Sequence, residues 1–249
     1  NSQITDHIYY SAVHYNGAGT NGSVNDITTN ENKLVSSTTL NYNKTFGDHG
    51  LSFLAGFESE KNVTDFQRAT GTDLPTSSLQ TVVTAGVQSA SSYEWGNSIV
   101  SGLARLEYNY KQKYFLSSSY RRDGSSRFGK NSRYGYFPAG SIGWVMSEEK
   151  FISSIKFISF LKLRASLGQV GNAEIGNFPQ LGLFSGDAGY AGAAGQRPSQ
   201  IANPDLRWET TTQTDVGIDF GIFDNRISGE IDYYFKKTTG LLLNVNIPS

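Results

Sequence analysis

Charged side chains placed two or four residues apart inside otherwise apolar stretches are the groups in this sequence best suited to chemistry. On an extended strand every second side chain lies on the same face. Each such pair therefore projects from one side of a strand, where it could line a path for a polar ligand or neutralise a pair on a neighbouring strand. The eight residues are Arg105, Glu107, Lys162, Arg164, Asp215, Asp219, Glu230 and Asp232.

We expect these charges to be mainly structural. If segments 161–169 and 210–222 are neighbouring strands, Lys162 and Arg164 can reach Asp219 and Asp215 across the ladder. Opposite charges on adjacent strands stabilise a sheet modestly. The alternative is that the same side chains line a route for substrate.

A second set of residues could bind a ligand directly. Arg122 and Arg127 lie in "RRDGSSRFG" (121–129), although Asp-Gly and Ser-Ser also favour a plain turn there. Tyr190 and Trp208, like Trp95, lie in or near long polar segments, where aromatic rings could stack on sugars. Aromatic residues make up 13% of the chain, so any one of them is a weak candidate.

Catalytic and metal chemistry find little support in the sequence. It contains no Cys, and its three His share no metal-ligand spacing and no partners arranged as a triad. The Gly-rich segment 186–196 lacks the Lys-Ser/Thr ending of a phosphate-binding loop. A net charge of −1 gives no basis for nucleic-acid binding. We therefore predict no enzyme activity, no catalytic residues, no metal and no cofactor.

The elements that carry these residues alternate with period two, which is typical of β-strands. Eight segments show the pattern, and residues 7–15 are a possible ninth. The eight are 33–46, 51–60, 101–110, 114–122, 136–147, 161–169, 210–222 and 227–237. Segment 148–160 is expected to be a short helical or irregular link. Tight turns separate some strands, whereas long loops, extracellular if the sheet crosses an outer membrane, are expected at about 61–97 and 170–206.

This alternation fits a soluble β-sandwich or a membrane β-barrel. Three features favour the barrel. Tyr, Phe and Trp gather at strand ends, as at membrane interfaces. The apolar faces carry many small residues, and loops of this length are unusual in compact soluble domains. No stretch reaches 18 apolar residues, so no transmembrane helix is expected. The predicted fold class is all-β: an antiparallel transmembrane β-barrel.

Three stretches resemble one family closely. "RRDGSSRFG" (121–129), "LKLRASLGQVGN" (161–172) and "NPDLRWETTTQTDVGIDFG" (203–221) occur in the order and spacing of the SusC/RagA family, TonB-linked outer-membrane transporters of Bacteroidetes. The resemblance covers roughly residues 33–249. It implies that residues 1–249 supply about eight to nine strands of a 22-stranded barrel. The family's plug and TonB box are expected outside this chain, whose ends look cut from a longer protein.

The resemblance also implies a function and partners. The whole protein would import oligosaccharides or peptides through the cell outer membrane, surrounded by outer-membrane lipid. A SusD-like surface lipoprotein would act as a lid, and TonB would act through a region absent here. The eight strand charges would then face the barrel lumen. Two alternatives stay open: an outer-membrane barrel hydrolase, and a soluble β-sandwich that acts as a binding or adhesin module. The cargo cannot be read from the loops.

Overall fold

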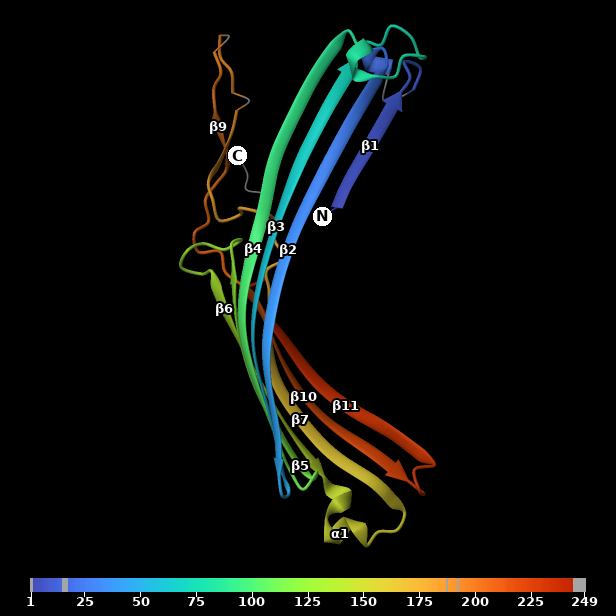
Figure 1. Cartoon of the computed structure of the whole chain (residues 1–249), viewed down its shortest axis with the longest axis vertical. Coiled ribbons are helices and arrows are strands. Elements are labelled where there is room, and N and C mark those ends of the chain that lie inside the picture. The colour runs from blue at the N-terminus through green and yellow to red at the C-terminus, as the bar shows by residue number, and fades with distance from the viewer. Residues whose placement is uncertain (1, 15–17, 187, 192, 244–249) are drawn as a thin grey trace. The chain divides into compact units, whose positions relative to one another are not determined.

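The chain folds mostly into antiparallel β-strands. The structure, a computed structural model, describes residues 2–14, 18–186, 188–191 and 193–243. A nine-stranded sheet has the order β1-β2-β3-β4-β5-β6-β7-β10-β11 (Figure 1). The strands are β1 (Ser2–Tyr10), β2 (Ser23–Phe46), β3 (His49–Thr72), β4 (Val87–Tyr110), β5 (Tyr114–Ser125), β6 (Tyr134–Val145), β7 (Ile158–Asn172), β10 (Glu209–Ile222) and β11 (Ile227–Thr239).

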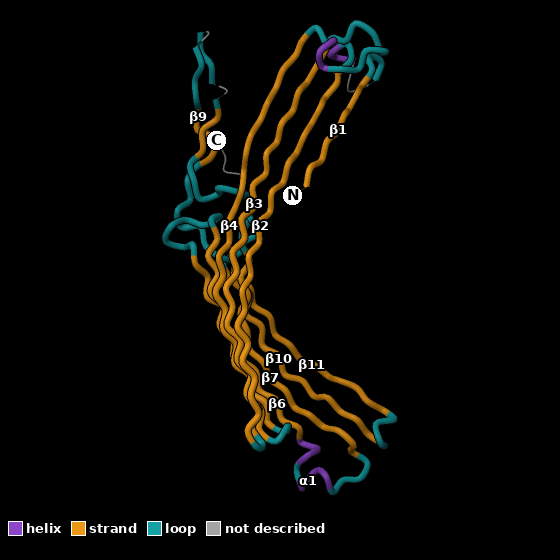
Figure 2. Tube along the Cα trace, in the orientation of Figure 1, coloured by secondary structure: helices purple, strands orange, loops and turns teal. Residues whose placement is uncertain are grey.

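The remaining elements are short. Strands β8 (Leu183–Ser185) and β9 (Arg197–Gln200) pair with each other in a separate two-stranded sheet. Helical turns are η1 (Ala18–Thr20), η2 (Val82–Thr84), η3 (Met146–Glu148) and α1 (Lys150–Ser153), drawn in purple where visible in Figure 2. Over the ranges that the structure describes, no helix is long and apolar enough to cross a membrane.

All eight expected strands are present, as β2 to β7, β10 and β11. The possible ninth is β1, which ends at Tyr10; residue 15 of the expected segment lies outside the described residues. The short link expected at 148–160 contains α1. Strand β7 extends to Asn172, into the loop expected at 170–206. The strands among the described residues from 173 to 206 are those of the small hairpin β8–β9, so most of the described part of this segment is loop.

The bounds predicted for the first long loop, 61–97, are wrong at both ends. Strand β3 continues to Thr72 and β4 begins at Val87, so the connection spans only 73–86. Residues 61–72 and 87–97 mix polar and apolar side chains on both faces, which hides the period of two. Backbone pairing with a neighbouring strand needs no apolar face, and ladder hydrogen bonds extend these strands beyond their apolar stretch.

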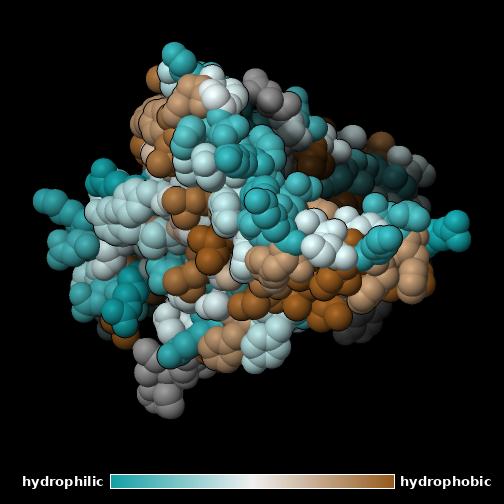
Figure 3. Space-filling view, turned by 90° about the horizontal axis from the view of Figure 1, so that it is seen from below, coloured by the Kyte–Doolittle hydropathy of each residue, from teal (hydrophilic) through white to brown (hydrophobic). Residues whose placement is uncertain are grey.

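The faces of the sheet differ in polarity. Val216 on β10 and Ile231 on β11 share one face and are 52% and 66% exposed. Ile142 on β6 is also exposed, at 61%. No second layer of the described chain covers these side chains, as a β-sandwich would require. In the space-filling view, brown apolar groups lie at the surface in contiguous stretches (Figure 3). The apolar face is therefore uncovered.

Two compact units make up the chain, residues 1–35 with 60–98 and residues 36–59 with 99–249. The first has a small core of Val24, Leu74 and Ala85. Gly71 lies against this core, since a Cβ added there would be 2.7 Å from the Cβ of Ala85. The absence of a side chain at Gly71 thus allows close packing.

In the second unit, aromatic rings gather where β5 and β6 meet the link to β7. The rings of Tyr114 and Trp144 are stacked, with their centroids 6.4 Å apart. The Tyr114 hydroxyl donates a hydrogen bond of 2.7 Å to Glu149 Oε1, and the Trp144 indole N–H lies 3.5 Å from the same oxygen. Lys113 Nζ is 4.0 Å from Glu149 Oε2. The Tyr114 hydrogen bond is the main cause that lowers the pKa of Glu149 below its ordinary value.

This hydrogen bond predicts that the stability of the segment between β6 and β7 depends on pH. Because the folded-state pKa of Glu149 is lowered, its stabilising contribution is complete above the ordinary glutamate pKa of 4.5 and is lost as pH falls through the lowered value. The variant Tyr114→Phe should move this loss to higher pH. Protection factors from hydrogen exchange of residues 146–153, measured against pH in the full-length protein, test this. Glu149→Gln should remove the pH dependence, and identical profiles for Tyr114→Phe and the parent would contradict the account.

Candidate functional site

An ion cluster spans three adjacent strands on the polar face of the second unit. Arg164 of β7 donates from Nε to Asp219 Oδ1 on β10 at 2.9 Å. Its Nη2 lies 2.8 Å from Asp232 Oδ2 and 3.6 Å from Glu230 Oε2, both on β11. One guanidinium thus contacts three carboxylates. The cluster crosses the sheet and links strands that do not pair directly with each other.

Gly217 makes this reach possible. In the strand register, Gly217 of β10 lies between Arg164 and Asp232. A Cβ added at Gly217 would stand 2.3 Å from Asp232 Oδ1 and 2.8 Å from Arg164 Cζ. Any side chain would therefore occupy the space of the ion pair. The sequence signal for it is a glycine inside a strand, which often marks a close approach.

The pairing of charges differs in detail from the expected one. Arg164 binds Asp219 instead of Asp215, whose carboxylate accepts a hydrogen bond of 2.9 Å from Gln213. Lys162 is aligned with Asp219 in the register, but its Nζ lies 5.5 Å from the centre of the Phe115 ring. The forked guanidinium of Arg164 donates hydrogen bonds to two of its three carboxylate neighbours, Asp219 and Asp232, which an ammonium cannot do with the same geometry.

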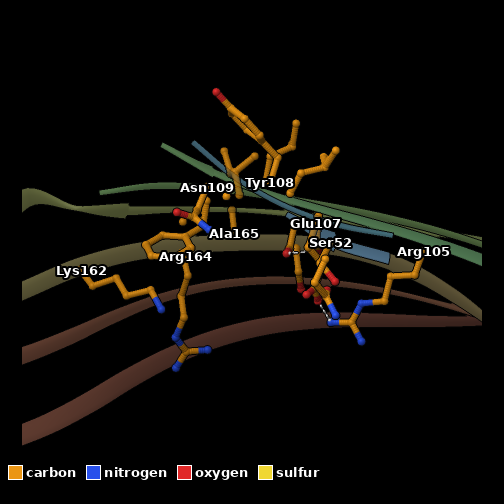
Figure 4. A pocket seen from close by; sticks show the side chains of 18 of the residues that line it. Ser52, Arg105, Glu107, Tyr108, Asn109, Lys162, Arg164 and Ala165 are labelled. Carbon is orange, nitrogen blue, oxygen red and sulfur yellow. Dashed lines mark hydrogen bonds and ion pairs between the residues drawn. The ribbon is translucent and has the colours of Figure 1, made fainter. Parts of the chain in front are cut away.

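Arg105 and Glu107 form an ion pair along β4. With Lys162, Arg164 and Asp215 they line a hollow of about 590 Å³ in the second unit. Figure 4 shows Arg105, Glu107, Lys162 and Arg164 on one side of the strands, whereas Tyr108 points to the other side. Two of the eight predicted charges thus lie on β4 and the other six on the adjacent strands β7, β10 and β11, and most of them already have a partner of opposite charge. The charged side chains that line the hollow could bind a polar molecule.

A second cluster lies at the far end of β5 and β6 from the short turns. Phe128 is fully buried, and its ring centroid is 4.9 Å from that of Trp208. The Phe137 ring meets Trp208 edge-on at 5.4 Å. The Trp208 indole N–H donates to the carbonyl of Arg133 at 3.1 Å. This rim cluster (Phe128, Phe137 and Trp208) fixes the loop after β5 against the segment that enters β10. Neither phenylalanine could be singled out from the sequence, because nothing in their spacing distinguishes them from other strand-end aromatics.

Arg127 ties the same loop to the long segment after β7. Its Nη1 donates to the carbonyl of Ala173 at 3.0 Å, and its Nε lies 3.4 Å from Asn177 Oδ1. Beside it, the backbone at Gly129 approaches Pro204, whose carbonyl oxygen would be 2.4 Å from an added Cβ. The structure thus gives Arg127 and Trp208 roles in holding loops in place.

Arg122 and Tyr190 lie apart from this cluster. The guanidinium of Arg122 is 3.9 Å from the centre of the Tyr134 ring and 5.9 Å from that of Tyr136. It lies on the opposite face of β5 from Arg121, which bonds Asp123. Tyr190 is 86% exposed in the loop between β8 and β9. The four predicted ligand-binding residues therefore do not form one site.

Comparisons with known proteins give consistent matches. The family described as "TonB dependent receptor-like, beta-barrel" matches residues 2–249. TonB-dependent receptor P39 of Formosa agariphila is 40% identical over 213 residues, covering 84% of this chain and 20% of that relative. TonB-dependent receptor SusC of Bacteroides thetaiotaomicron is 34% identical over 235 residues, covering 90% and 23%. A solved structure of the RagAB peptide transporter superposes with a TM-score of 0.82 at 27% identity, covering 91% of this chain and 26% of that one.

An antiparallel sheet with an uncovered apolar face and a charged face behind it defines the class of protein, the wall of a β-barrel. The chain belongs to the TonB-dependent receptor family and is SusC/RagA-like within it. It spans between a fifth and a quarter of the length of the curated relatives named above. The family and the fold class expected from the three sequence stretches are confirmed.

Gly217→Ala should break the ion cluster while it leaves the strand ladder intact. We expect a lower thermal unfolding midpoint for the full-length protein in detergent. The midpoint is measured on gels as the temperature at which the fast-migrating band of the folded protein disappears. Gly102→Ala is the matched control: Gly102 lies inside β4, and an added Cβ there meets no atom within 4 Å. Equal midpoints for the two variants would show that Arg164 and Asp232 do not need the space at Gly217.

Phe128→Ala should loosen the rim cluster. Removing a fully buried Phe costs about 3–5 kcal/mol, so the free energy of local opening of residues 126–133, measured by native-state hydrogen exchange, should fall by a similar amount. Phe184→Ala is the control, because Phe184 is 67% exposed and its loss should change protection by less than about 0.5 kcal/mol. A Phe128→Ala protein with unchanged protection would contradict a structural role.

Proposed function

We propose that this chain is part of the barrel wall of an outer-membrane transporter that imports nutrients with energy from TonB. The uncovered apolar face carries this proposal. Val216 and Ile231 would contact lipid, and the opposite face with Arg164 and its carboxylates would face an aqueous lumen. Backbone groups in lipid must all be paired, and the ladders from β1 to β11 supply that pairing through the described strands.

Strand length supports an extended wall. Strands β2, β3 and β4 have 24 residues each. At about 3.3 Å per residue such a strand is roughly 80 Å long, whereas a tilted strand crosses the hydrocarbon core in about 9–11 residues. The short turns after β2 and β4 would lie in the periplasm, and the other ends of these strands would project outside the cell. The 22-strand total of the whole barrel is a prediction.

The partners and the cargo are part of the same proposal. A SusD-like lipoprotein would cover the outer rim, TonB would act through a region outside this chain, and the cargo would be an oligosaccharide or a peptide. The similar solved structure, RagAB, is that of a peptide transporter. We propose that Arg127, Tyr190 and Trp208 lie near the cargo route at the rim. Arg122, on the face that carries Tyr134 and Tyr136, would instead meet anionic lipid headgroups.

The two alternatives have less support. A soluble sandwich would leave Val216 and Ile231 in water. A barrel hydrolase needs a nucleophile, a base and an orienting acid in contact. Within the described ranges His7 contacts Asp26, and His49 contacts Tyr108; neither contact includes a serine hydroxyl. No group of three or more His, Asp or Glu there could hold a metal ion.

The proposal predicts energy-dependent import. Deletion of the gene for the full-length protein should abolish growth on its cargo, tested on oligosaccharides and peptides as the only carbon source. Return of the gene should restore growth, and a proton uncoupler should stop uptake in the restored strain. The protein should fractionate with outer membranes. Uptake that persists without the gene, or a protein recovered in the soluble fraction, would contradict the proposal.

A further inference from the structure

Three aromatic rings form a stack in the first unit. The Phe66 ring of β3 lies 4.5 Å from the Tyr93 ring of β4, with an interplanar angle of 22°. Tyr93 is followed on the same face by Trp95, at 5.3 Å and 29°. Rings stacked directly face to face have centroids about 3.5 Å apart. The longer centroid distances here mean that neighbouring rings are displaced sideways from each other. Each ring therefore leaves part of a face uncovered, and Tyr93 is 55% exposed.

This stack lies on the polar face of its strands. Phe66 occupies the same face of β3 as Glu60 and Asn62, because even positions along one strand share a side. Lys33 Nζ of β2 pairs with Glu60 at 2.9 Å, and Asn62 donates to Glu31 of β2 at 3.1 Å. The aromatic stack is thus next to two polar pairs. Lipid contact on the opposite face does not explain these rings.

The rings and the polar pairs are close together along the strands. Gly96, directly after Trp95, is against the backbone of β3: a Cβ added there would be 2.4 Å from the carbonyl oxygen of Asn62. The backbone next to Trp95 therefore lies beside that of Asn62, the residue that bonds Glu31. An apolar platform with donors and acceptors at its edge is the usual composition of a small-ligand site.

We propose that Phe66, Tyr93 and Trp95 form a binding subsite for a sugar ring of the cargo. A pyranose has a face of C–H bonds, slightly positive, which stacks on the negative face of an aromatic ring. Its rim carries hydroxyls that donate to the carboxylates of Glu31 and Glu60 and accept from Asn62 and Lys33. This inference rests on the proposed import function and assigns the cargo to the carbohydrate class.

A peptide fits the same surface less well. Extended peptides bind sheets mainly by adding a strand at an unpaired edge. Strands β3 and β4 are each paired on both sides, so their backbone hydrogen bonds are already used. Only side-chain contacts are left for a peptide, whereas the sugar uses both the ring faces and the polar rim.

Binding of defined oligosaccharides tests the proposal. The purified full-length transporter with its lipoprotein is applied to an array that holds maltohexaose, cellohexaose, laminarihexaose, mannohexaose and a set of defined decapeptides. The Kd of each compound retained is then measured by titration calorimetry. We expect an oligosaccharide to bind and Trp95→Ala to raise its Kd about ten-fold. Trp95→Phe should restore most of the affinity, and Tyr93→Phe should retain the stack.

Tyr42→Ala is the control. Tyr42 is an exposed aromatic of β2 in the second unit, on the face of Leu40, and its loss should leave the Kd unchanged. The subsite is overturned if no oligosaccharide is retained, if Trp95→Ala binds as well as the parent, or if decapeptides alone lose affinity in the variant. Failure of the proposed function is distinct, since then the gene deletion strain would take up cargo normally. If the parent protein supports import and the Trp95→Ala variant imports oligosaccharide at the same rate, the subsite proposal is contradicted and the proposed import function stands.

Discussion

The two-residue period of paired β-strands is the constraint on which this structure depends. Each strand bonds its neighbours through the backbone, so its side chains can only project to one face or the other. A one-residue slip would exchange the two faces completely. The register that aligns Val216 with Tyr233 also aligns Gly217 with Asp232. Apolar exposure on one side and an ion cluster on the other are therefore a single consequence of one register.

Glycines allow close contacts at places where a side chain must reach across a strand or two backbone segments must meet. Gly217 leaves room for Arg164 to span β10, and Gly129 lets the backbone approach Pro204. The bulky residues at the strand ends do the opposite: Phe128 and Trp208 fill the rim, and Trp144 packs near Tyr114 at the short turns. Small residues thus allow contact within the wall, and large ones fix the connections at its ends.

Much of the fold could be predicted from the sequence, since the strict alternation over 161–169 or 227–237 suits a strand and does not suit a helix. The extension of β3 and β4 through 61–72 and 87–97 could not, because these residues carry no apolar periodicity and their strand conformation depends on pairing with neighbours. The charges at Arg164 and Asp219 were identified, but their exact pairing depends on side-chain reach. The stack of Phe66 and Tyr93 is a contact between residues 27 positions apart (93 − 66), which only the register of β3 and β4 reveals.

The central claim is that one face of this sheet contacts hydrocarbon and the other contacts water. The sequence contains no Cys, so single cysteines can report each face. In outer membranes that contain the full-length protein, with any cysteine elsewhere removed, Val216→Cys and Ile231→Cys would be compared with Gln213→Cys. The account predicts that a lipid-soluble reagent labels the first two, and that a water-soluble maleimide labels only Gln213→Cys. Rapid labelling of Val216→Cys and Ile231→Cys by the water-soluble maleimide would contradict it.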